Sequence, residues 1–329
     1  MKFSVSTWRL SVLSVATAAG LLAAGVGNTA SATLLWYDGF DTTTDYTAGA
    51  ALGGQSGGAG SFFSGAWAQA GGDDHVVSAT SLTRPGQIIP SIGGSASDLD
   101  ATPCCITSRT ASLFSSPWGG FGDPDDTFYA GFLVTFGTGE TKHHRVLEMH
   151  DGGFDDSLNR VLQFGYSEFT GVGPDMAIWV KDSSDSSTQQ VELSEAVDYA
   201  QDAGTTHFVV LKFDMSTSTD DVISVYLDPV GTTEPAVPSA QVTVGQFLAD
   251  RFGAVTNFVF GGGGGSRPNE VDTAGTLDEL RFADNRDGMG FAQVANNTLP
   301  YTPVPEPTTA ILLGLGSLGL LGVSRRSRM

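Results

Sequence analysis

The feature that most constrains this chain is residues 206–229, THFVVLKFDMSTSTDDVISVYLDP. Two runs rich in Val, Ile, Phe and Tyr flank a polar turn, which is the pattern of a β-hairpin. Neighbouring residues such as Val209 and Val210 make both faces of the first run apolar. We therefore expect this pair inside a sheet, with a second layer over at least one face. Pro229 ends the second strand, because proline cannot donate a ladder hydrogen bond.

Similar short patterns recur along the chain, separated by turns rich in glycine, of which the sequence has 43. Together they amount to about a dozen strands, and only 246–252 has a helical pattern. We therefore predict an all-β fold, a two-sheet antiparallel jelly-roll sandwich. The other strands are predicted at 34–40, 62–67, 127–136, 142–150, 160–166, 176–180, 189–193, 241–244, 255–260 and 276–282.

The N-terminus has the pattern of an export signal. A basic start and an apolar run over 10–27 precede Ala30 and Ala32, small residues of the kind that a signal peptidase reads. The sequence therefore predicts a signal peptide over 1–32, with signal peptidase as a partner. An uncleaved membrane anchor is the alternative reading.

The C-terminus has three parts in a fixed order: a Pro-Glu-Pro triplet, an apolar run over 310–323 and an arginine cluster. This order resembles the PEP-CTERM sorting signal of Gram-negative bacteria. The resemblance implies a short apolar helix held transiently in the inner membrane, cutting by an exosortase, and release to the cell surface or the extracellular matrix. We predict a sorting signal over 301–329 and one domain over 33–300. The motif residues are Pro305, Glu306, Pro307, Arg325, Arg326 and Arg328.

The charge of the chain restricts its partners. The formal net charge is −20, and the two end signals hold five of the 16 basic residues but one of the 36 acidic ones. The predicted mature domain is therefore more acidic still, at −24. Such a domain repels nucleic acid and anionic lipid, so we expect no nucleic-acid partner. It is compatible with divalent cations, although solubility alone also explains it.

Four segments carry a wider resemblance: LLWYDGFD at 34–41, VVLKFD at 209–214, VISVYLDP at 222–229 and LDELRFAD at 277–284. They resemble the concanavalin A-like lectin/glucanase superfamily, in the laminin-G-like form found in PEP-CTERM proteins. The resemblance implies that the first and last strands are neighbours. It also implies a structural calcium ion bound there by oxygen ligands; turn aspartates are the alternative. The candidate ligands are Asp38, Asp41 and Asp278.

Residues 143–151, HHRVLEMHD, form the second candidate site. On a strand, His144, Glu148 and His150 project to one side, but the two histidines lie about 20 Å apart along it, too far for one ion. Glu148 and His150 could share a site, and a polar sheet face in this fold can bind a ligand. Trp118, in a Pro/Gly loop, is the aromatic candidate for stacking on a sugar ring.

Signatures of catalysis are absent from the sequence. Glucanases of this superfamily carry Glu-x-Asp-x-Glu on one strand, so that two acids flank the glycosidic bond. Here Glu148 and Asp151 fall on opposite faces, and no His-Glu-x-x-His or Walker pattern occurs. Cys104 and Cys105 are adjacent, which leaves a vicinal disulfide, free thiols or an intermolecular bridge open.

These observations predict a secreted, exosortase-sorted protein of the surface or extracellular matrix of a Gram-negative bacterium. We expect it to be non-catalytic and either glycan-binding, with an extracellular polysaccharide as partner, or structural. The alternative is a polysaccharide-active enzyme of the same fold, a glycoside hydrolase or a lyase.

Overall fold

The computed structural model describes residues 34–60, 66–70, 75–84, 93–98, 106–110, 127–136, 143–150, 160–167, 175–181, 188–192, 204–216, 218–244, 257–260, 275–285 and 288–295. Both predicted end signals, Trp118, the two cysteines and the helical pattern at 246–252 lie outside these residues. Within them, none of the helices reaches the length and hydropathy that crossing a bilayer requires.

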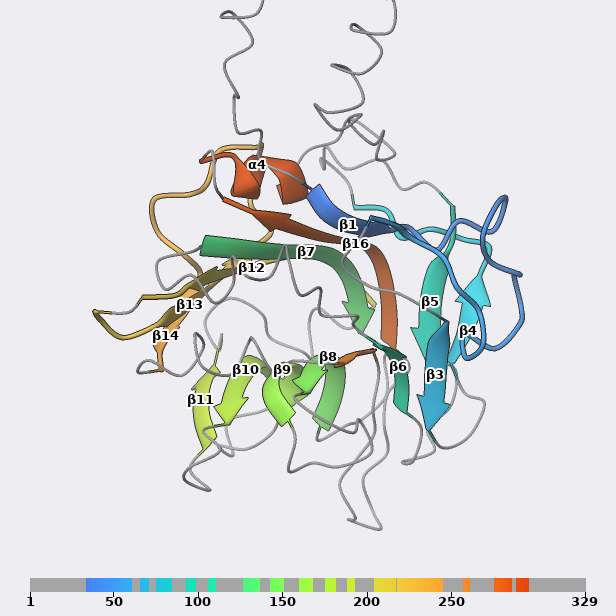
Figure 1. Ribbon diagram of the computed structural model, residues 1–329, viewed down its shortest axis with the longest axis horizontal. Helices are drawn as coiled ribbons and strands as arrows, with labels where there is room; N and C mark the ends of the chain where they lie inside the picture. The colour runs from blue at the N-terminus through green and yellow to red at the C-terminus, as the bar shows by residue number, and fades with distance from the viewer. Residues whose placement is uncertain are drawn as a thin grey trace, which may run out of the picture.

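The described strands form two antiparallel sheets, which Figure 1 shows as two layers. The nine-stranded sheet A runs β14-β13-β12-β7-β16-β1-β2, with β5 paired to β16 and β4 to β5. Its strands are β1 (Leu34–Asp38), β2 (Ala59–Gly60), β4 (His75–Ser78), β5 (Ser95–Asp98), β7 (Thr127–Phe136), β12 (Thr206–Asp214), β13 (Val222–Leu227), β14 (Ala240–Thr243) and β16 (Gly275–Asp284).

The seven-stranded sheet B runs β11-β10-β9-β8-β15-β6-β3. Its strands are β3 (Trp67–Ala70), β6 (Ile106–Thr110), β8 (His143–His150), β9 (Arg160–Ser167), β10 (Asp175–Lys181), β11 (Thr188–Glu192) and β15 (Asn257–Phe260).

Aromatic side chains join the two sheets in one core. Phe132 of sheet A meets Phe164 of sheet B edge to face, with ring centroids 5.5 Å apart. Phe258 of sheet B meets Phe282 of sheet A in the same way, also at 5.5 Å. Such contacts add to the burial of apolar area, which is the main driving force of folding. The predicted fold class, an all-β two-sheet jelly-roll sandwich, is confirmed.

The hairpin that constrains the sequence lies inside sheet A, as predicted. β12 pairs with β13 on one side and with β7 on the other. Val209 and Leu211 pack into the core between the sheets. Phe208 and Val210 pack on the outer face of sheet A, in a second cluster with the helix α4 (Gly290–Ala295). Both faces of the strand are therefore buried.

The first and last strands are neighbours, as the resemblance carried by their sequences implied. β1 runs antiparallel to β16, with Trp36 opposite Phe282 and Tyr37 opposite Arg281. Figure 1 shows both strands beside α4. The register of β16 against β7 shifts between Asp278 and Arg281. Glu279, within this bulge, has a φ of 54°, a backbone conformation that is rare for residues other than glycine.

Strand number is the main difference from the expectation. The described part has sixteen strands, and the additional ones include β5 and β6. Their sequences, SASD and ITSRT, are short and polar. Period-2 apolar alternation cannot detect such strands, because their pairing is set by the strands beside them, β16 for β5 and β15 for β6.

Candidate functional site

The strand β8 carries a buried pair, Glu148 and His150. Leu147 and Met149 of the same strand pack into the core between the sheets. Since side chains alternate along a strand, Glu148 and His150 lie on the outer face of sheet B, as the sequence predicted. Their side chains are nevertheless only 0 and 1 % exposed, and His150 Nε2 lies 2.8 Å from Glu148 Oε2.

The other ring nitrogen of His150 is the unusual atom of this pair. Nδ1 is buried and has no hydrogen-bond partner in the described part of the chain. Buried polar atoms in folded proteins are nearly always hydrogen-bonded, and leaving one unpaired costs about 1–3 kcal/mol. An unsatisfied buried nitrogen therefore calls for an explanation, such as strain, a bound water molecule or a ligand.

Backbone register places further polar residue types beside this pair. Gln163 of β9 is opposite Glu148, and Arg160 of β9 is opposite His150. Asn257 of β15 is the other register partner of His150. These three residues belong to the two strands that flank β8.

A second polar cluster lies where β1 meets β16. Asp38, Asp278 and Glu279 are at most 1 % exposed, and Arg281 is 3 % exposed. Arg281 donates to Glu279 at 2.8 Å, and the hydroxyl of Tyr37 donates to the same carboxylate at 3.1 Å. Burial and the neighbouring charge of Glu279 raise the pKa of Asp278 well above its usual range, and Asp38 adds to the effect.

The predicted calcium ligands are only partly brought together. Asp38 and Asp278 belong to this cluster, and each of their carboxylate oxygens already accepts a hydrogen bond from the protein. Asp41 lies in a separate exposed turn, where it accepts from Thr43 and Thr44. In the described residues, no group of three His, Cys, Asp or Glu side chains is arranged to hold a metal ion. A calcium ion here would have to share these oxygens with their present donors.

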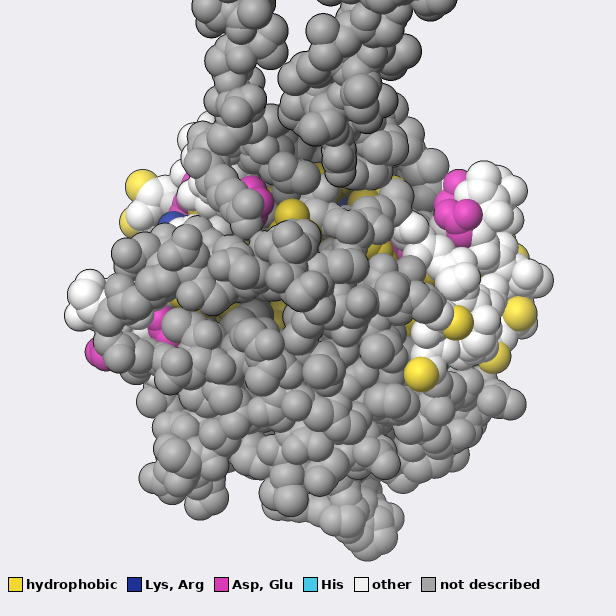
Figure 2. Space-filling model, viewed as in Figure 1, with side chains coloured by type: hydrophobic (Ala, Val, Ile, Leu, Met, Phe, Trp, Pro, Cys, Tyr) yellow, Lys and Arg dark blue, Asp and Glu magenta, His cyan; other side chains and the backbone are white. Residues whose placement is uncertain are grey.

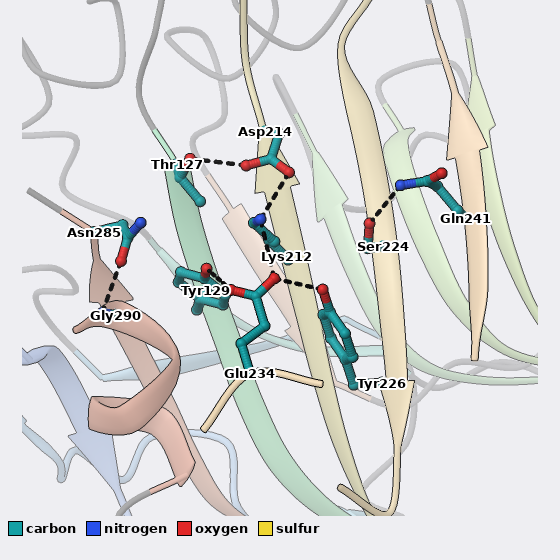
Figure 3. A network of polar contacts seen from close by, with 10 residues as sticks. All are labelled: Thr127, Tyr129, Lys212, Asp214, Ser224, Tyr226, Glu234, Gln241, Asn285 and Gly290. Atoms are coloured by element: carbon teal, nitrogen blue, oxygen red, sulfur yellow. Dashed lines mark hydrogen bonds and ion pairs between the residues drawn. The ribbon is translucent and has the colours of Figure 1, made fainter. Parts of the chain in front are cut away.

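A third cluster, which the sequence did not reveal, lies on the outer face of sheet A. Glu234 comes from the loop between β13 and β14, and Figure 3 shows its carboxylate between three donors. Tyr129 donates to it at 2.7 Å, Tyr226 at 2.5 Å and Lys212 at 3.0 Å. Lys212 also pairs with Asp214 at 3.1 Å. We call these five residues the Glu234 cluster.

Hydrogen bonding dominates the electrostatics of the Glu234 cluster. Burial alone would raise the pKa of Glu234, but the bonds from Tyr226, Tyr129 and Lys212 outweigh it and hold this pKa below its usual value. Burial and, second, the Glu234 carboxylate raise the pKa of Tyr129 and of Tyr226. Both phenols are therefore donors rather than candidate bases, and the cluster fastens the loop to the sheet.

A fourth group combines Arg84, His207 and Asp228. His207 Nδ1 lies 2.9 Å from Asp228 Oδ2, and Arg84 reaches the other oxygen at 2.5 Å. The amide of Phe208 also donates to Asp228, at 2.8 Å. His207 Nε2 is buried and has no hydrogen-bond partner among the residues that the structure describes. In the sequence, the dipeptide Asp228-Pro229 at the end of the hairpin indicates a turn, and Asp228 of this turn is the residue that joins the group.

The remaining predicted site residues cannot be placed. Trp118 lies outside the described residues, and His144 belongs to β8 but its side chain is not described. The surface agrees with the acidic composition, since the face in Figure 2 shows acidic side chains and little basic surface in the described part.

Comparisons with known proteins identify the C-terminal tail of the chain. Residues 303–328 match the PEP-CTERM protein-sorting motif. This match indicates exosortase-dependent sorting to the cell surface of a Gram-negative bacterium. No curated protein is significantly similar to the chain.

Solved structures of similar fold are distant in sequence. The alginate lyase Aly36B, in complex with alginate trisaccharide, is 13 % identical with a TM-score of 0.40, covering 57 % of this chain and 80 % of its own. The endo-β-1,4-glucuronan lyase of the fungus Trichoderma reesei is 13 % identical with a TM-score of 0.41, covering 68 % and 91 %. The binding domain of botulinum neurotoxin serotype D/C is 11 % identical with a TM-score of 0.42, covering 71 % and 51 %. These likenesses concern the fold and say nothing about what this chain binds.

Proposed function

We propose that this chain is a non-catalytic surface protein whose jelly roll binds an extracellular polysaccharide at the outer face of sheet B. Its partners during export are signal peptidase and exosortase, and its destination is the cell surface or the extracellular matrix. The observation that carries the proposal is the buried pair Glu148–His150, in which His150 Nδ1 has no partner among the described residues. A glycan hydroxyl is a group that satisfies such a nitrogen.

The test is a glycan array followed by affinity electrophoresis of the full chain. Binding of a polysaccharide, with loss in His150→Gln, supports the proposal, because glutamine keeps a donor for Glu148 and removes the ring nitrogen. The matched control is His207→Gln, which alters another buried histidine beside a carboxylate and should bind normally. If no glycan on the array binds, the structural alternative is left, a matrix protein without a glycan ligand.

The second candidate is a polysaccharide-active enzyme of the same fold. What favours it is again Glu148–His150, since an imidazole oriented by a carboxylate is a common arrangement for general base catalysis. Release of reducing ends, or the ultraviolet absorbance of an unsaturated uronate product, would show turnover. Any turnover that His150→Gln abolishes would replace the binding function by this one.

Separately, we propose that a structural calcium ion binds where β1 meets β16. Asp38 and Asp278 place buried carboxylate oxygens on both strands, and calcium prefers such ligands. A bound ion stabilises the folded state by mass action, so chelator should lower the melting temperature. Asp278→Asn should abolish that response. A melting curve that chelator leaves unchanged contradicts the site.

A further inference from the structure

The helix α4 is the last described element before the sorting tail, and it is firmly packed against sheet A. Phe291, Val294 and Ala295 are at most 4 % exposed. The ring of Phe291 meets those of Tyr129 and Tyr226 edge to face, at centroid distances of 6.0 and 5.4 Å. A helix of six residues does not persist alone in water, so this packing holds it in place. The tail therefore leaves the domain from the outer face of sheet A.

The start of the described chain lies on the same face. Leu34, the first residue of β1, packs against the apolar cluster to which α4 belongs. Figure 1 shows α4 on one side of sheet A and the strands of sheet B on the other. The predicted signal peptide and the sorting tail thus both join the domain at the outer face of sheet A.

The stretch between α4 and the apolar run of the tail is short compared with the domain. It comprises residues 296–309, and the span from 295 to 310 is at most about 54 Å when fully extended. A domain of this size is roughly 45 Å across. If the outer face of sheet B met the bilayer, this stretch would have to run round the edge of the domain almost fully extended. Four prolines within 300–307 oppose such a curved path, because proline-rich sequences are semi-rigid.

We propose that the outer face of sheet A is turned toward the bilayer while the sorting tail is anchored, and that the outer face of sheet B is turned away from it. The chain then binds its polysaccharide before an exosortase releases it. A formal net charge of −20 repels anionic lipid and so keeps the domain off the bilayer surface. The order of events rests on the proposed glycan-binding function, whereas the orientation rests on the anchored tail and the position of α4.

The experiment measures which face of the anchored full chain lies near lipid. The chain is inserted into phosphatidylcholine vesicles that contain a lipid with a nitroxide headgroup, which quenches a nearby fluorophore. Cys104→Ser and Cys105→Ser remove the native thiols. A dye is then attached in Val237→Cys, at a position that is 78 % exposed and follows Glu234 in the loop on the outer face of sheet A. In a second chain it is attached in Ser184→Cys, in the connection between the sheet B strands β10 and β11.

We expect the nitroxide lipid to quench the dye at position 237 and to leave the dye at position 184 unquenched. The matched control carries an insertion of about twenty Gly and Ser residues after Asn297, which lengthens the extended reach of the stretch to about 126 Å. With that reach the stretch passes round the domain without being extended, so the two dyes should be quenched to similar degrees.

Laminarin, a soluble glucan, is the probe for binding before release. Wild type on vesicles should bind laminarin as tightly as wild type in detergent micelles does, because the outer face of sheet B stays open to solvent in both.

The outcomes separate the orientation from the function. Equal quenching of the two dyes without the insertion, or stronger quenching at position 184, overturns the orientation, whatever the chain binds. A chain that does not float with the vesicles overturns the anchored state. Laminarin binding in micelles but not on vesicles overturns binding before release. Absence of laminarin binding in both, with the expected quenching, counts against the glycan-binding function and leaves the orientation standing.

Discussion

The outer faces of the two sheets each hold a polar group, and the two groups are built differently. On sheet A, the Glu234 carboxylate accepts from Tyr129, Tyr226 and Lys212, and Lys212 also pairs with Asp214. On sheet B, Glu148 and His150 are more deeply buried, and Nδ1 of the histidine is left without a partner among the described residues.

This difference in hydrogen bonding suggests different roles for the Glu234 cluster and the Glu148–His150 pair. A polar network whose members are all hydrogen-bonded stabilises the fold and fixes a loop, as Glu234 does between β13 and β14. A buried pair that leaves a polar atom unsatisfied is less stable than an apolar substitute, and such departures from good packing are expected at functional sites. We therefore propose a structural role for the Glu234 cluster and a binding role for Glu148–His150.

The largest expected effect is on sheet B. Replacing the buried pair by Glu148→Leu/His150→Leu should leave stability unchanged or raise it by about 1–4 kcal/mol, because two buried polar side chains give way to apolar ones of similar size. Glycan binding should be lost in the same variant. Urea unfolding and affinity electrophoresis measure the two properties. A variant that unfolds more easily and still binds would reverse our assignment.

On sheet A the expected pattern is the opposite. Glu234→Ala removes the shared acceptor of two buried phenols, so stability should fall by about 1–3 kcal/mol while glycan binding is unchanged. Tyr129 is 1 % exposed, so its hydroxyl, left without an acceptor, should account for most of the lost stability. Glu234→Gln, which keeps an acceptor, is the control and should lose less. Equal losses in both variants would show that packing of the loop, and not its hydrogen bonds, matters.

A smaller effect should appear on acidification. The pKa of Glu234 is lower in the folded state than in the unfolded chain, so its contribution is present above the usual glutamate pKa and is lost as the pH falls through the lower folded value. Between these two pKa values, wild type should lose stability that Glu234→Gln does not lose. Parallel curves of unfolding free energy against pH for the two proteins would contradict this role.

Much of the fold could be predicted from local sequence, because period-2 alternation identifies long strands such as β7 and β12. The same alternation placed Glu148 and His150 on one side of β8. It could not find Glu234, whose partner Tyr129 is 105 residues away, since only the tertiary fold joins them. Nor could it separate Asp41 from Asp38, because local bonds from Thr43 hold Asp41 in its own turn.

The central claim is that the outer face of sheet B binds a glycan through His150 without cleaving it. The most direct measurement is isothermal titration of the full chain with laminarin, with product analysis of the same mixture. We predict measurable binding, its loss in His150→Gln, and unchanged chain length of the laminarin. Equal affinity in wild type and His150→Gln, or shortened laminarin, would contradict the account.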